Sequence, residues 1–264
     1  RAHHVGQQQR LLSLEQARAN KPRLIYDDLP KPEFTGIRVL SSEPVAADES
    51  PLTCSCGHNH SQPEEDSSPR ILPISLEDVV PYIDWSPFFH TWELRGVYPK
   101  ILQHEQHGEE ARRLFADAQK LLGEIVSKKL LKLRAVYGLF PANSVGEDVE
   151  LYTDESRTKS LATLHFLRQQ LEKGDASPNW CLADYVAPKQ PTANDHLGAF
   201  AVTAGIGLDE LVKQFKAAHD DYNAIMAEAL ADRLAEAFAE YLHKRVRDEW
   251  GYGQSENLAS EDLI

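Results

Sequence analysis

The sequence predicts an α+β fold in which a twisted, mainly antiparallel sheet packs against long helices. Two segments, residues 107–132 and 222–249, repeat apolar residues at intervals of three and four, which is the period of a helix with one buried face. Five short runs of β-prone residues lie between them, separated by turn signals such as Asn143-Ser-Val-Gly146 and Lys173-Gly-Asp175. Long helices alternating with blocks of short strands are typical of this class.

The first 75 residues predict little regular structure. Residues 1–21 are polar and helix-permissive, and three prolines between positions 22 and 32 then interrupt the chain, so we expect an interdomain arm over residues 1–35. Residues 41–70 are rich in Ser, Glu, Pro and His and nearly lack large apolar side chains, so burial would not offset their ordering entropy. They predict a disordered insertion within a linker over residues 36–75, with regular structure beginning near Ile71.

The remaining residues, 76–264, predict one folded domain. The helix over 107–132 has glutamates at its start and lysines at its end, an order that complements the helix dipole. Two helices, over residues 208–219 and 222–249, close the chain. The β-prone runs between these helices cover residues 136–140, 149–152, 161–167, 179–186 and 197–203.

Composition restricts the possible partners. A formal net charge of -13 argues against nucleic acid and anionic membranes, because both attract basic patches. The sequence contains neither a run of about 18 apolar residues nor a signal peptide. Its three cysteines, two of them in Cys54-Ser-Cys56, do not form a disulfide framework. We therefore expect a cytoplasmic protein whose partners are neither nucleic acids nor membranes.

One carboxylate, Asp84, lies within an aromatic segment over residues 82–98. Ionising a carboxylate inside an apolar cluster costs several kcal/mol unless a cation or hydrogen-bond donors compensate, so an ordered partner is expected. Alternatively, Asp84 is a helix N-cap, because aspartate is a favoured capping residue and Pro87 follows it. Both interpretations stay open from the residues alone. The aromatic residues around Asp84 are Tyr82, Trp85, Phe88, Phe89 and Trp92.

Two loops contain residues that bind ligands in other proteins. Cys54-Ser-Cys56-Gly-His58-Asn-His60 offers thiolates and imidazoles, but its spacing differs from that of zinc sites, so a linker is favoured over adventitious metal binding. Residues 138–146 predict a strand end followed by a loop whose amides and Asn143 face a ligand or simply connect a hairpin. Neither glycine-rich phosphate-binding pattern occurs.

The acidic residues near the C-terminus have structural explanations. Glu236 lies near Arg233 and Glu240 at helical spacing, which is typical of a solvated ladder of ion pairs. Asp220 and Asp221 precede the last helix and would cap it. No Ser or Cys nucleophile has a recognisable setting, so we predict neither catalytic residues nor metal ligands.

Several separate motifs together resemble one known family, the activation domain of cobalamin-dependent methionine synthase. The resemblance extends from about Val79 to Ile264, and residues 1–21 resemble the connector that leaves the cobalamin-binding domain. The motifs are the aromatic segment 82–98, Tyr98-Pro-Lys-Ile-Leu, the segment from Glu147 to Arg157, Leu167-Arg-Gln-Gln170, Cys181-Leu-Ala-Asp-Tyr-Val-Ala-Pro188, Gly198-Ala-Phe-Ala-Val-Thr203, His219-Asp-Asp-Tyr-Asn223 and the run from Ala229 to His243.

This resemblance implies a role in reductive methylation. The family's activation domain binds S-adenosylmethionine and presents its methyl group to cobalamin, held by the neighbouring domain of the same chain, after the cofactor has become cob(II)alamin. Flavodoxin or an equivalent reductase supplies the electron. The full enzyme is a methyltransferase of methionine biosynthesis that moves a methyl group from methyltetrahydrofolate to homocysteine. Its zinc-binding homocysteine domain, folate barrel and Asp-x-His-x-x-Gly cobalamin loop do not occur in these residues, so this chain is not expected to form methionine alone.

The resemblance also implies site residues. It assigns the family's ammonium-binding carboxylate to Asp84 and a position near the ligand to Glu236. The family's Arg-Pro-Ala-x-Gly-Tyr-Pro element, which holds the ligand's carboxylate and adenine, is expected after Ile264, so the domain is expected to be truncated and to bind S-adenosylmethionine weakly. A rival hypothesis is a non-enzymatic docking module for a cobalamin carrier or flavodoxin that does not bind S-adenosylmethionine.

Overall fold

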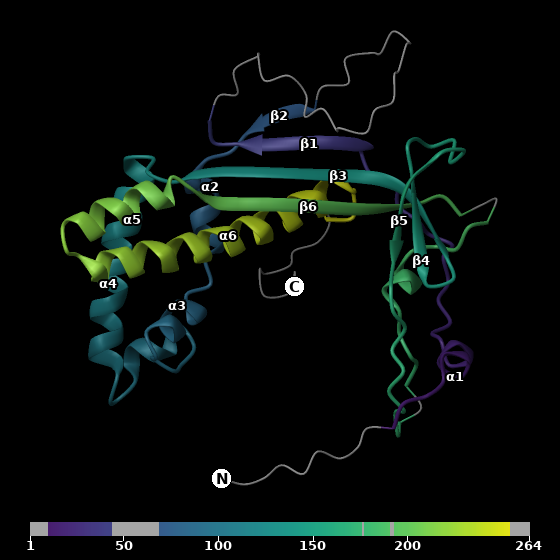
Figure 1. Cartoon of the computed structure of the whole chain (residues 1–264), viewed down its shortest axis with the longest axis horizontal. Coiled ribbons are helices and arrows are strands. Elements are labelled where there is room, and N and C mark those ends of the chain that lie inside the picture. The colour runs from purple at the N-terminus through teal and green to yellow at the C-terminus, as the bar shows by residue number, and fades with distance from the viewer. Residues whose placement is uncertain (1–9, 44–68, 176, 191–192, 254–264) are drawn as a thin grey trace. The chain divides into compact units, whose positions relative to one another are not determined.

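The computed structural model describes residues 10–43, 69–175, 177–190 and 193–253 (Figure 1). The chain divides into two compact units. Unit 1 contains Arg1–Gly36 and Leu139–Ala199, and unit 2 contains Ile37–Gly138 and Phe200–Ile264. None of the helices in the described residues combines the length and apolar composition that a membrane span requires.

The described residues form six strands and six α-helices, which confirms the α+β class. The strands are β1 (Gly36–Ser41), β2 (Arg70–Pro73), β3 (Lys132–Val145), β4 (Asp148–Tyr152), β5 (Ser160–His165) and β6 (Asp195–Ile206). The α-helices are α1 (Leu14–Ala19), α2 (Leu76–Val79), α3 (Ser86–Thr91), α4 (Gly108–Ser127), α5 (Leu208–Ala217) and α6 (Asp221–Glu249). Three short 3₁₀ helices are η1 (Val80–Tyr82), η2 (Lys100–Gln103) and η3 (Leu182–Tyr185).

The sheet is mixed, with strand order β2-β1-β3-β4-β5 and β6 paired with β3. β1 and β2 are parallel, whereas β3, β4 and β5 pair in antiparallel order. β6 also runs opposite to β3, because Gly207, just after β6, lies against the carbonyl of Leu130, just before β3. A Cβ atom at Gly207 would lie 2.6 Å from that oxygen, and its φ is +97°, so this turn requires glycine.

Unit 2 contains the long predicted helices. The helix predicted over 107–132 is α4, which buries the apolar face that the period indicated and ends at Ser127, where Lys129 adopts a positive φ of 52°. The two predicted C-terminal helices are α5 and α6, which pack side by side (Figure 1). The end of α6 is bound to β3 through Glu249, whose carboxylate accepts a 2.9 Å hydrogen bond from buried Tyr137. The buried residues of α4 include Ala111, Leu114, Ala118, Leu121, Leu122 and Ile125.

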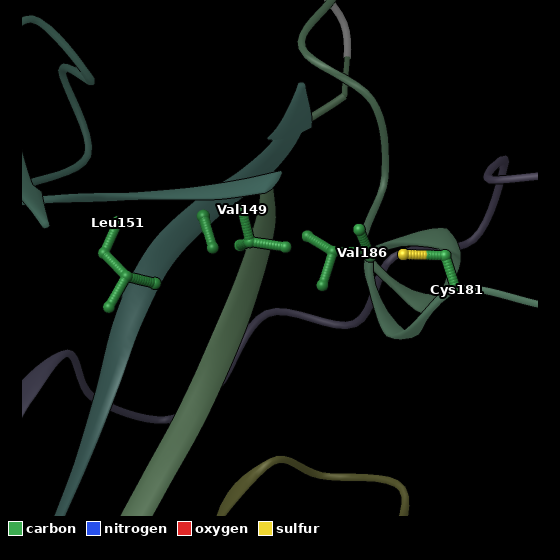
Figure 2. Packing of buried hydrophobic residues seen from close by; sticks show 6 residues of the cluster. Val149, Leu151, Cys181 and Val186 are labelled. Atoms are coloured by element: carbon green, nitrogen blue, oxygen red, sulfur yellow. The ribbon is translucent and has the colours of Figure 1, made fainter. Parts of the chain in front are cut away.

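Unit 1 has a small core of its own, made by strands and irregular chain. In Figure 2 the side chain of Val149, on β4, points toward Val186, which follows η3. The cluster consists of Ala142, Val149, Leu151, Cys181, Ala183 and Val186. The N-terminal arm belongs to this unit, because Ala17 is fully buried and Arg18 donates to Glu147 at 2.6 Å. The prediction of an arm is thus corrected to a packed segment over the described residues from Arg10 onward.

Several predicted boundaries are wrong. Regular structure begins with α1 at Leu14 rather than near Ile71, and β1 pairs with β2 across the intervening residues. The insertion predicted over 41–70 therefore loses its ends to these strands, and residues 44–68, which include Cys54, lie outside the described residues. The β-prone run 179–186 forms η3 instead of a strand, since Asp184 turns back to accept a hydrogen bond from the backbone N–H of Cys181.

The predicted loop over 138–146 is also wrong, because β3 continues through it to Val145. Pro141 lies just before the residues of β3 that pair with β4, whose register starts at Ala142. The amide of Asn143 is buried and donates to the carbonyls of Ala187 and Ala193. Asn143 therefore has a structural role, and its side chain does not face a ligand.

Candidate functional site

Asp84 lies between η1 and α3, where two prolines shape the chain. Pro81 and Pro87 occupy the first turns of η1 and α3, positions at which the missing N–H removes no helical hydrogen bond. The Oδ1 atom of Asp84 accepts a 2.8 Å hydrogen bond from the N–H of Ser86, the first residue of α3. The contact closes a local turn before α3 and occupies only one carboxylate oxygen, whereas the N-cap position of α3 is Trp85, without a side-chain cap, rather than Asp84. Among the described residues, Asp84 forms no ion pair.

The expectation that Asp84 is buried among aromatic rings is wrong. Asp84 is exposed, whereas Trp85, Phe88 and Phe89 beneath it are buried. Trp85 contacts the ring of Phe115 on α4 edge to face, with centroids 4.9 Å apart. The rings thus form a rigid base in the core of unit 2, and the turn between η1 and α3 holds the carboxylate outside it. Asp84 therefore avoids the cost of desolvation and can reach a ligand from solvent.

The turn that holds Asp84 packs against α6. The ring of Tyr82 on η1 meets Tyr241 on α6 edge to face, with centroids 5.6 Å apart, and this contact fixes the Asp84 turn against the helix. Glu236 is exposed and pairs with Arg233 through two hydrogen bonds of 2.6 and 2.8 Å. The predicted ion pair between Arg233 and Glu236 is therefore confirmed.

Glu240 joins Asp84 and Glu236 electrostatically. Its carboxyl is half-buried, and burial raises its pKa, as do the negative charges of Asp84 and Glu236. The charges of the two residues named from the sequence therefore both act on this third carboxyl group. Sequence reasoning treated Glu240 as part of a solvated ladder. One feature of the sequence could have drawn attention to Glu240. It lies four residues after Glu236, and two like charges at this spacing destabilise a helix.

The other candidates from the sequence do not join this site. Asp220 caps α6 by accepting a 3.0 Å hydrogen bond from the N–H of Asn223, as predicted.

A cavity of about 620 Å³ is lined by His90, Glu93 and Arg95, at the opposite end of α3 from Asp84. Within the described residues, no three His, Cys, Asp or Glu side chains are grouped to hold a metal ion.

A buried ion-pair network in unit 1 was not predicted from the sequence. Arg168, whose side chain is 2% exposed, donates to Asp184 at 2.7 and 2.8 Å and to Glu147 at 3.0 Å. Glu147 also accepts from Arg18 on α1, and these two arginines, Arg18 foremost, lower the pKa of Glu147 to about 2. The network joins the N-terminal segment to the strands. Its members lie in separate motifs, so spacing alone does not reveal it.

Comparison with known proteins identifies the family. Residues 75–264 match the family model described as vitamin B12 dependent methionine synthase, activation domain. A solved structure described as the crystal structure of the MetH reactivation domain bound to AdoHcy is 45% identical, with a TM-score of 0.80. The match covers 96% of this chain and 69% of that one. The chain therefore belongs to the vitamin B12 dependent methionine synthase activation domain family.

Proposed function

We propose that this chain binds S-adenosylmethionine and serves as the reactivation module of a cobalamin-dependent methionine synthase. The observation that carries the proposal is the family match over residues 75–264. The solved relative bound to AdoHcy supports the ligand class, since AdoHcy differs from S-adenosylmethionine by one methyl group and one positive charge.

The residues of the candidate site fit this ligand. S-adenosylmethionine carries an ammonium and a sulfonium, and Asp84 exposes a carboxylate that forms no ion pair with a described residue. A carboxylate that accepts from an ammonium forms a strong, charge-assisted hydrogen bond. The aromatic base and the Tyr82–Tyr241 contact hold Asp84 in place, so little ordering is left for binding. Glu236, fixed by Arg233, adds negative charge near the ligand.

In this proposal the described residues bind and orient the ligand and perform no proton transfer. S-adenosylmethionine supplies the methyl group for cobalamin, which we place on a preceding domain of the same chain. We propose that unit 2 docks on that domain and that flavodoxin or an equivalent reductase supplies the electron. Methyl transfer to homocysteine, with its zinc site, then belongs to the full enzyme. The match covers 69% of the solved relative, so the tests use the full-length enzyme.

The experiment is the substitution Asp84→Asn in the full-length enzyme. Asparagine still accepts the hydrogen bond from Ser86 but removes the negative charge, so the melting temperature should barely move. Loss of a charge-assisted contact of about 1.5 to 3 kcal/mol should weaken S-adenosylmethionine binding roughly ten- to a hundredfold in calorimetry. Turnover should start normally and then decay as oxidised cobalamin accumulates. Glu228→Gln, an exposed charge loss elsewhere on α6, is the matched control.

The possible results separate the hypotheses. An Asp84→Asn enzyme that binds S-adenosylmethionine and is reactivated with flavodoxin like the parent would remove Asp84 from the site and leave it as a helix cap. A parent enzyme that fails to bind S-adenosylmethionine, yet still associates with its cobalamin domain or flavodoxin, would favour the docking module instead.

A further inference from the structure

Ser86, the first residue of α3, makes two hydrogen bonds that join the Asp84 turn to a more distant segment. Its N–H donates to Oδ1 of Asp84 at 2.8 Å, and its hydroxyl oxygen accepts a 3.2 Å hydrogen bond from the N–H of Tyr98. The first contact closes a local turn, whereas the second joins residues that lie 12 positions apart in the sequence. Ser86 therefore connects the exposed carboxylate to the chain beyond α3.

The anchor of this connection is Tyr98, whose ring packs on the aromatic base of unit 2. The ring stacks on Phe89 of α3 at an interplanar angle of 13°, and its centroid lies 5.3 Å from that of Phe115 on α4. Phe89 is fully buried. Close packing restricts how far such a ring can move, so the backbone N–H of Tyr98 keeps a defined direction toward Ser86.

The start of α3 depends on this brace because its own capping is weak. The helix begins after Trp85, whose side chain makes no capping hydrogen bond, and Pro87 has no N–H. Asp84 is exposed, and within the described residues its carboxylate has no partner other than the N–H of Ser86. Water competes with that single contact. The orientation of the carboxylate therefore depends on the position of Ser86, which its hydroxyl group fixes.

We propose that Ser86 is a positioning residue for S-adenosylmethionine, whose hydroxyl group, held by Tyr98, keeps the Asp84 carboxylate oriented toward the ligand's ammonium. This inference rests on the proposed function and adds a residue that acts through Asp84 without touching the ligand. Ser86 occupies Oδ1 of Asp84, so Oδ2 is available to the ammonium. A side chain that is oriented before binding loses less conformational freedom when the ligand arrives, and the ligand then binds more tightly.

The test removes the hydroxyl group in the full-length enzyme. Calorimetry should show that Ser86→Ala weakens S-adenosylmethionine binding about three- to tenfold, because the Asp84 side chain must then be ordered on binding. Ser86→Thr keeps the oxygen that accepts from Tyr98 and should restore the parental affinity. The matched control is Thr91→Val, which removes a hydroxyl group bonded to the carbonyl of Pro87 at the other end of α3 and should leave the affinity unchanged.

A double variant separates positioning from a general structural effect. If Ser86 acts through Asp84, Ser86→Ala should weaken binding less than twofold once Asp84→Ala has removed the carboxylate. Full weakening in that background, or parental affinity of Ser86→Ala alone, would overturn the inference. Thermal melts identify a folding defect, and Ser86→Cys, whose sulfur accepts only weakly, replaces Ser86→Ala if that variant is unstable.

The proposed function fails in a different way. A parent enzyme that does not bind S-adenosylmethionine would refute that function, and an Asp84→Ala enzyme that binds like the parent would remove Asp84 from the site. Failure of the Ser86 inference alone leaves the parental affinity and the loss caused by Asp84→Ala intact, so the two failures are distinguishable.

Discussion

Substitution of Arg168 should lower the free energy of unfolding of unit 1 by more than the loss of an exposed ion pair would. Its side chain is 2% exposed and makes four hydrogen bonds, to both oxygens of Asp184, to Glu147 and to the carbonyl of Asn179. Arg168→Met fills much of the same volume but leaves the Asp184 carboxylate, which is 10% exposed, without its cation. Breaking a buried pair by removing one partner costs about 3 to 5 kcal/mol, because the other charge stays buried.

The matched control is Arg18→Met, which removes the other arginine bound to Glu147. Arg18 is 55% exposed, and Glu147 keeps Arg168, so we expect a cost of at most about 1 kcal/mol. Urea unfolding of this chain, followed by tryptophan fluorescence, measures both variants against the parent. If Arg168→Met costs no more than Arg18→Met, the network contributes no more to stability than a surface ion pair does.

Three further predictions follow from the charged groups. Because the pKa of Glu147 is about 2 in the folded chain and ordinarily 4.5, its contribution to stability is complete above pH 4.5 and is lost as the pH falls toward 2. Acid unfolding of Glu147→Gln should lack this component. Asp84→Ala should lower the free energy of unfolding by about 1 kcal/mol in urea, whereas Asp84→Asn should lower it much less, because asparagine can still accept from Ser86. Equal costs for the two variants would show that this hydrogen bond does not contribute. Burial and the charges of Asp84 and Glu236 raise the pKa of Glu240, so a cationic ligand bound beside it should release protons at mildly acidic pH. Calorimetry in buffers of different ionisation enthalpy checks this, and buffer-independent enthalpies would contradict it.

The long helices were predictable because their signal is local. The apolar period over 222–249 matches α6, which covers Asp221–Glu249, and the period over 107–132 locates α4. A helix with one apolar face needs only a surface to pack against, whatever that surface is, so its residues carry the information themselves. The capping role of Asp220 was predictable for the same reason, since its hydrogen bond reaches only three residues along the chain.

Tertiary contacts decided the strands and the site. The parallel pairing of β1 with β2, the continuation of β3 past Pro141 and the folding of 179–186 into η3 each depend on partners distant in the sequence. The family resemblance named Asp84 and Glu236, but the sequence placed Asp84 in the aromatic core, whereas the turn before α3 holds it outside. Glu240 became a candidate only in the folded chain, where η1 packs on α6 and where burial and the charges of Asp84 and Glu236 raise the pKa of its carboxyl. Periodicity reports which face of an element is buried, whereas a site depends on which elements meet.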